Sequence, residues 1–126
     1  ELVQLQLGGL YGFDALKAAF LGYAAENAQR ALLMAQGAAY EILDHPVTRH
    51  DLDRIIADRP IAMMSPDHHT VWANTAALEK AGLLHGKDVG VGNEIVMGPD
   101  GLANGAAITG LNTAFILTMR CTNQSR

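Results

Sequence analysis

The sequence has a single cysteine and no concentration of positive charge, and both features narrow the possible functions. Cys121 is the only cysteine among 126 residues, so disulfides within the chain and zinc sites built from several cysteines are excluded. One thiol is typical of a reducing compartment, and no signal peptide is visible after Glu1, so we expect a cytoplasmic protein. The nine Lys and Arg residues are scattered, and the net charge is −4. Nucleic acid is not an expected partner, because phosphate contacts need clustered basic side chains.

Long apolar runs and several catalytic motifs are missing as well. Apolar runs such as residues 31–35 and 61–64 are far shorter than the roughly 20 residues of a membrane helix, so no membrane span is expected. There is no serine nucleophile elbow, and the Gly-Val-Gly of residues 90–92 does not continue into a phosphate-binding loop. Cys121 has no neighbouring base to activate its thiol. These absences exclude the common nucleophilic and nucleotide-binding arrangements.

What is present is the composition and periodicity of one globular α/β domain spanning residues 1–126. Hydrophobic residues make up 49% of the chain and charged residues 17%. Period-2 and helical patterns alternate along the sequence, and a turn at residues 98–101 separates two late strands. We expect strands at residues 2–7, 60–65, 93–97, 102–108 and 114–119, helices at 15–27 and 70–81, a short helix carrying Leu52, Ile55 and Ile56, and either strand or further helix at 31–36. The order predicts alternating strand–helix units followed by a β-hairpin.

Three local signals mark the expected helix ends. Asp14 is a candidate N-cap for the first long helix. Thr48 and Asp51 form a capping-box variant, with Asp in place of Glu at the third helical position. Gly82 suits the left-handed position that ends a helix.

The densest polar cluster follows the predicted strand at residues 60–65. It comprises Asp67, His68 and His69, with Trp72 and Asn74 shortly after. Ligands of α/β folds bind beyond the carboxyl ends of strands, and histidine can act as base, acid or metal ligand, so this loop is the candidate site. The structural alternative is that Asp67 caps the following helix and both histidines are partly exposed. No metal site is assigned, because adjacent residues do not readily share one ion.

The remaining histidines and aromatic residues have structural interpretations. His45, His50 and His85 each lie beside a turn or a helix cap and are interpreted as surface residues. Trp72 is also expected in the core, together with Met63 and Met64, and the hydroxyls of Tyr11, Tyr23 and Tyr40 are expected at the surface.

Several segments together resemble one known family. They are residues 48–53 (Thr-Arg-His-Asp-Leu-Asp), 59–61 (Arg-Pro-Ile), 67–83 (Asp-His-His-Thr-Val-Trp-Ala-Asn-Thr-Ala-Ala-Leu-Glu-Lys-Ala-Gly-Leu), 93–96 (Asn-Glu-Ile-Val), 100–101 (Asp-Gly) and 104–105 (Asn-Gly). Their order and spacing are similar to those of amidohydrolase family 3, in the metal-dependent hydrolase superfamily. The resemblance covers residues 9–105 and is most specific at residues 70–82. His69 matches the family histidine, whereas His68 replaces a glycine, which implies a different backbone path there.

The resemblance implies a TIM barrel of several hundred residues with a small flanking β-domain. That family hydrolyses amide or related C–N bonds of small molecules with a metal-activated water, and zinc is the expected ion. Its ligands begin with an HxH motif, which this sequence lacks, and continue on later barrel strands. We therefore expect an internal fragment, part of a barrel and its insertion rather than a complete barrel, holding no metal itself. Residues 106–126 fall outside the resemblance as an uncertain tail.

Three hypotheses follow. In the first, the chain is a fragment of a hydrolase without a complete active site, and Asp67, His68, His69, Trp72 and Asn74 lie on the substrate side. In the second, it is a small oligomeric binding or assembly module. In the third, it is an independent small metallohydrolase that uses the loop from Asp67 to His69. A homo-oligomer is expected, because a barrel fragment exposes apolar surface and strand edges.

Overall fold

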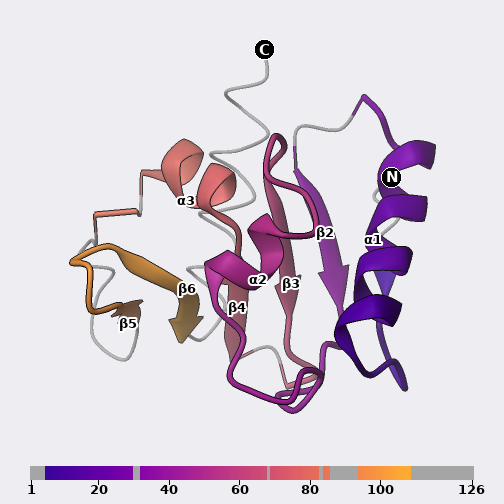
Figure 1. The fold of residues 1–126 in the computed structure, drawn as a ribbon, viewed down its shortest axis with the longest axis horizontal. Coiled ribbons are helices and arrows are strands. Elements are labelled where there is room, and N and C mark those ends of the chain that lie inside the picture. The colour runs from indigo at the N-terminus through magenta and orange to yellow at the C-terminus, as the bar shows by residue number, and fades with distance from the viewer. Residues whose placement is uncertain (1–4, 30–31, 68, 83, 86–93, 109–126) are drawn as a thin grey trace.

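The computed structural model describes residues 5–29, 32–67, 69–82, 84–85 and 94–108, which form a six-stranded sheet with helices on both faces (Figure 1). Along the chain the described elements are β1 (Leu5–Gln6), α1 (Phe13–Glu26), β2 (Leu33–Gln36), α2 (Arg49–Asp53), β3 (Ile61–Met64), β4 (Thr70–Ala73), α3 (Thr75–Ala81), β5 (Glu94–Met97) and β6 (Ala103–Ile108). The α/β class and the late hairpin are confirmed. None of the described helices is both long and apolar enough to cross a membrane.

The sheet has the strand order β1-β2-β3-β4-β6-β5 and is not closed into a barrel. β1, β2 and β3 are parallel neighbours, and the other pairings are antiparallel. Leu33 lies opposite Ile61 in the parallel part, and Met63 lies opposite Trp72 where the antiparallel part begins. The carboxyl ends of β2 and β3 therefore lie side by side, at the same end of the two strands.

Alternation along the strands divides the core between the two faces of the sheet. On one face, Leu33, Ile61 and Met63 pack with Leu16 and Phe20 of α1, and the same cluster includes Leu52 of α2, Ile55, Ile56 and Trp72. On the other face, Met34, Ala62, Val71 and Ala73 pack with Ala77 and Leu78 of α3. Residues 33–36 carry no hydrophobic alternation because both faces of β2 are covered, so their assignment as a strand needed the tertiary structure.

The prediction of one helix over residues 70–81 was wrong in its first third. Thr70–Ala73 is strand β4, which pairs with β3 on one side and β6 on the other. Its Thr-Val-Trp sequence has high strand propensity, and both neighbouring strands satisfy its backbone groups. Helix α3 begins only after Asn74, whose side chain accepts the N–H of Ala77, so the alternative in which Asp67 caps this helix is also wrong.

Other helix-end predictions had mixed outcomes. Asp14 lies inside α1, which begins at Phe13 after Gly12, so the predicted N-cap was wrong. The capping box of α2 is confirmed, because the side chains of Thr48 and Asp51 each accept the backbone N–H of the other residue, that of Thr48 lying 2.9 Å from Asp51 Oδ2. The Thr48 hydroxyl also lies 3.2 Å from Asp51 Oδ2. Gly82 ends α3 with a φ of 77°, as predicted. The predicted strand at 114–119 lies outside the described residues.

Candidate functional site

The loops that follow β2 and β3 meet at the carboxyl ends of these parallel strands. The N–H of Ala38, just after β2, donates to the carbonyl of Met64 at 3.0 Å and holds the two exits together. The N–H of Ser65 donates to the carbonyl of Thr70 at 2.9 Å and closes the turn between β3 and β4. This turn carries Asp67 and His69, so the structure places them at the edge where the sequence predicted a site.

Tyr40 connects the two loops. Its hydroxyl lies 3.1 and 3.2 Å from the two carboxylate oxygens of Asp67 and 3.1 Å from the hydroxyl of Thr70. Asp67 Oδ1 also accepts the Ser65 hydroxyl at 2.5 Å and the backbone N–H of His69 at 3.1 Å. These donors, Ser65 first, lower the pKa of the Asp67 carboxyl below its ordinary value. The Asp67 carboxylate is therefore an ionised hydrogen-bond acceptor that is held in one orientation at the surface of the protein.

An aromatic pair supports this cluster from inside. The rings of Tyr40 and Trp72 meet edge to face, with centroids 5.5 Å apart and planes at 75°. Trp72 is buried in the core, as expected, whereas Tyr40 is 48% exposed. Trp72 therefore contacts the candidate site through the Tyr40 ring. The sequence interpretation of Tyr40 as a surface tyrosine missed its hydrogen bonds, because they join residues 25 to 30 positions apart.

Asn74 has a structural role at the opposite end of β4 from Asp67. Its side chain is buried, and its Oδ1 accepts the N–H groups of Ile61 and Ala77 at 3.1 and 2.9 Å. Its Nδ2 donates to the carbonyls of Ile56 and Arg59 at 2.8 and 2.7 Å. All four hydrogen-bonding positions of the amide are thus used within the chain. Tyr40 contacts both Asp67 and Trp72, and His69 is bonded to Asp67 through its backbone N–H, whereas Asn74 lies apart from them. His68 lies outside the described residues.

The described residues do not provide a metal centre. No three His, Cys, Asp or Glu side chains gather within the part of the chain that the structure describes. At the candidate site the Asp67 carboxylate already accepts hydrogen bonds from Ser65, Tyr40 and His69. The donor set therefore fits a hydrogen-bonded surface acceptor and not the three or four ligands of a hydrolytic metal ion.

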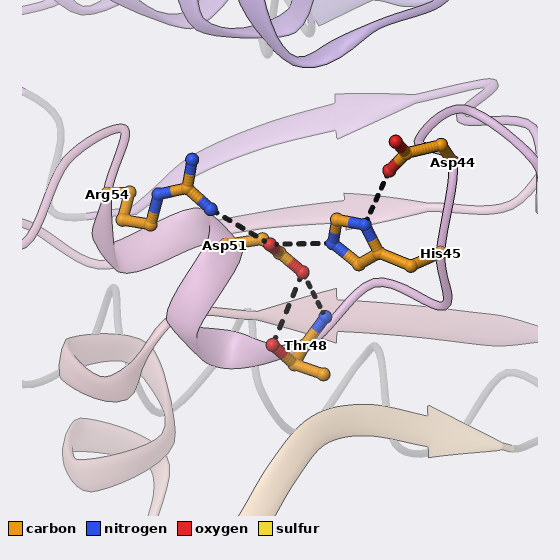
Figure 2. A network of polar contacts seen from close by, with 5 residues as sticks. All are labelled: Asp44, His45, Thr48, Asp51 and Arg54. Carbon is orange, nitrogen blue, oxygen red and sulfur yellow. Dashed lines mark hydrogen bonds and ion pairs between the residues drawn. The ribbon is translucent and has the colours of Figure 1, made fainter.

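A second polar cluster joins the β2–α2 connection to α2 (Figure 2). Nδ1 of His45 lies 2.6 Å from Asp44 Oδ1, and Nε2 lies 2.9 Å from Asp51 Oδ1. Asp51 Oδ1 also lies 3.5 Å from a guanidinium nitrogen of Arg54, and Asp51 Oδ2 accepts both donors of Thr48. The hydrogen bonds that the protonated ring donates to Asp51 and then to Asp44 raise the pKa of His45 above its ordinary value.

Arg49, at the start of α2, links this helix to the β5–β6 hairpin and α3. Its Nε donates to the carbonyl of Ala103 at 2.9 Å, Nη1 to the hydroxyl of Thr75 at 3.0 Å, and Nη2 to Asp100 Oδ2 at 2.7 Å. Gly105 lies against the same helix start, since a Cβ there would be 2.4 Å from the backbone nitrogen of Arg49. Three of the segments behind the family resemblance, residues 48–53, 100–101 and 104–105, are thus packed together.

Comparison with known proteins agrees with this architecture. The model of the amidohydrolase family matches residues 4–123, so the chain belongs to that family, and the match extends beyond residues 9–105 at both ends. No curated protein matches the chain.

Two solved structures have a similar fold. An uncharacterized metal-dependent hydrolase from Pyrococcus furiosus is 17% identical, with a TM-score of 0.61 over 92% of this chain and 21% of that one. An uncharacterized metal-dependent hydrolase from Pyrococcus horikoshii is 18% identical, with a TM-score of 0.60 over 96% of this chain and 24% of that one. The chain thus spans between a fifth and a quarter of the length of these hydrolases.

Proposed function

We propose that this chain supplies substrate-side structure to a metal-dependent amidohydrolase that cleaves amide or related C–N bonds of small molecules, and that it lacks a complete active site by itself. The observation that carries the proposal is the Tyr40–Asp67–His69 cluster at the carboxyl ends of β2 and β3. Ligands of parallel α/β sheets bind beyond such ends. An ionised, preorganised carboxylate can there accept a substrate N–H without further rearrangement.

Family membership supports the class of reaction, and the missing ligand set supports the incomplete site. The chemistry of that family depends on a metal ion, yet no group of three metal ligands occurs among residues 5–108 where they are described. The expected roles are therefore divided. Asp67 and His69 face the substrate, Tyr40 orients Asp67, and the ligands for the ion, expected to be zinc, belong to other segments of the enzyme.

Two measurements on the purified chain test this proposal. Metal content after equilibration with zinc and removal of the excess should be far below one ion per chain, in both the wild type and His69→Ala. Near-stoichiometric zinc that His69→Ala abolishes would contradict the proposal and favour a small independent metallohydrolase. In the second measurement, an N-acetylated amine titrated into the labelled protein should shift the amide signals of Asp67 and His69. Shifts confined to other surfaces would contradict the substrate-side assignment.

We also propose that the isolated chain self-associates through the edges of its sheet. β1 and β5 are the outer strands of the described sheet, and Met97 of β5 is among the exposed large hydrophobic residues. Edges of this kind pair readily with other strands. Sedimentation at increasing protein concentration should show a species larger than the monomer, and Met97→Lys should reduce it. A monomer at every concentration would contradict this proposal.

A further inference from the structure

His45 has both ring nitrogens against carboxylate oxygens, and this geometry sets its charge. A neutral imidazole carries one N–H, so it can donate to only one partner, and its other nitrogen presents a lone pair. The contacts of 2.6 Å to Asp44 and 2.9 Å to Asp51 both require a donor on the ring. Only the imidazolium form supplies two donors. The observed arrangement is therefore the one that a protonated His45 stabilises.

The two carboxylates differ in what holds them. Asp51 is only 6% exposed and remains bonded to Thr48, so it keeps its position whatever the charge on His45. Asp44 is 96% exposed, so water replaces its contact with His45 at little expense. Loss of the imidazolium proton would therefore release Asp44 first and leave the capping box of α2 intact.

The same residues line a cavity. Asp44, His45 and Arg54 form its polar side, and Gly12, Phe13 and Leu43 the remainder, around a volume of about 510 Å³. The guanidinium of Arg54 lies over the Phe13 ring, 4.4 Å from its centroid. The wall made by Asp44 and His45 thus depends on the contacts that need the imidazolium.

We propose that His45 is a pH-dependent clasp that, when protonated, bridges Asp44 and Asp51 and closes one wall of this cavity, and that opens the wall when it loses its proton. The charged groups around it are Asp44 from its own segment, Asp51 from α2 and Arg54 just after α2, while the cavity residues Gly12 and Phe13 at the start of α1 do not titrate. The buried side chains of Leu43 and Val47 anchor the chain on either side, so the opening is confined to residues 44–46. The clasp is independent of the function proposed above.

The experiment is an NMR pH titration of the full chain that follows the protonation and tautomer of His45 through its ring nitrogens. In the wild type, His45 should titrate above the ordinary value of about 6.5, and both nitrogens should carry protons below that pH. Each unit by which the pKa of His45 is raised means that the closed arrangement binds the imidazolium proton about tenfold more tightly. Asp44→Asn, which changes an exposed side chain and leaves the fold intact, should lower the pKa of His45, and Asp51→Asn should lower it further.

Backbone order provides the second measurement. The heteronuclear NOE of residues 44 and 45 should be high below the His45 titration and should fall above it. His45→Gln has both of its N–H donors on one nitrogen and cannot bridge two carboxylates on opposite sides as the ring does, so it should show the lower NOE at both pH values. The matched control is His85→Gln, in a different cavity beside Glu79, which should behave as the wild type. A His45 pKa at or below about 6.5, a pKa unchanged by Asp44→Asn, or constant backbone order across the titration would overturn the proposal.

Discussion

Asn74 and Ile61 are joined by two reciprocal hydrogen bonds, each 3.1 Å long. The N–H of Ile61 donates to Asn74 Oδ1, and the N–H of Asn74 donates to the carbonyl of Ile61. One buried amide side chain thereby ties the start of β3 to the end of β4 while it caps α3 through Ala77. Asn74 is therefore a junction of three elements.

Replacing Asn74 with Ala should lower the free energy of unfolding by roughly 2–4 kcal/mol. The change removes the helix cap and leaves the carbonyls of Ile56 and Arg59 and the N–H of Ile61 without their buried partner. Urea-induced unfolding, monitored by circular dichroism, measures this change in the free energy of unfolding. Asn104→Ala is the matched control, since that side chain accepts one local bond from Ala106 and should contribute less than about 1 kcal/mol. Equal losses of unfolding free energy in the two variants would contradict the role of Asn74 in joining β3, β4 and α3.

Gly105→Ala should destabilise the protein by about 2–4 kcal/mol, since overpacking and backbone strain add. The new methyl group would lie 2.4 Å from the nitrogen and 2.9 Å from the Cα of Arg49, and the φ of Gly105 is 113°. Backbone atoms at a helix start cannot move aside as a flexible side chain would. Gly22→Ala within α1 has nothing within 4 Å of the added Cβ and should instead stabilise by roughly 0.5–1 kcal/mol. Thermal unfolding of both variants should show melting temperatures that move in opposite directions.

Arg49→Lys should cost roughly 1–3 kcal/mol although it preserves the charge. The Arg49 side chain is only 9% exposed, and its three donor nitrogens bind three separate acceptors. A lysine ammonium on a flexible stem cannot reproduce this planar fork, so the buried carbonyl of Ala103 or the partly buried oxygens of Thr75 and Asp100 lose a donor. Chemical unfolding provides the measurement, and Arg54→Lys, on the exposed side of the same helix region, serves as the control. If Arg49→Lys loses no more unfolding free energy than Arg54→Lys, the positive charge of Arg49 is sufficient and its three-way hydrogen bonding is not needed.

Tyr40→Phe should raise the pKa of the Asp67 carboxyl, and Ser65→Ala should raise it more. Both hydroxyls donate to the ionised form, and the Ser65 contact is the shorter and contributes most to the lowered pKa. Because the folded pKa is depressed, Asp67 contributes stability above its unfolded pKa of about 3.9, and this contribution is lost as pH falls through the folded pKa. Each substitution should therefore shift that loss to higher pH. Carboxyl carbon shifts in an NMR titration measure both effects, and the reverse order would contradict the assigned geometry.

Local sequence patterns predicted those parts of the fold that depend on near neighbours. The helical spacing of Leu16, Phe20 and Tyr23 identified α1, and the capping box at Thr48 located the start of α2. The turn at residues 98–101 separated β5 from β6, and Gly82 marked the end of α3. In each case the residues that decide the conformation lie within one or two turns of one another.

The sequence by itself determined the α/β class, the family and the position of Asp67 and His69 just beyond a buried strand. Only the tertiary structure decided that Thr70–Ala73 is a strand, because the segment is separated from helix α3 by Asn74 alone and its pairing with β3 and β6 fixes where the strand ends. The tertiary structure also decided that Asn74 is a structural junction, that Tyr40 orients Asp67 and that His45 is held between two carboxylates. These roles arise from side chains brought together by strand order and helix packing, and no local periodicity encodes that proximity.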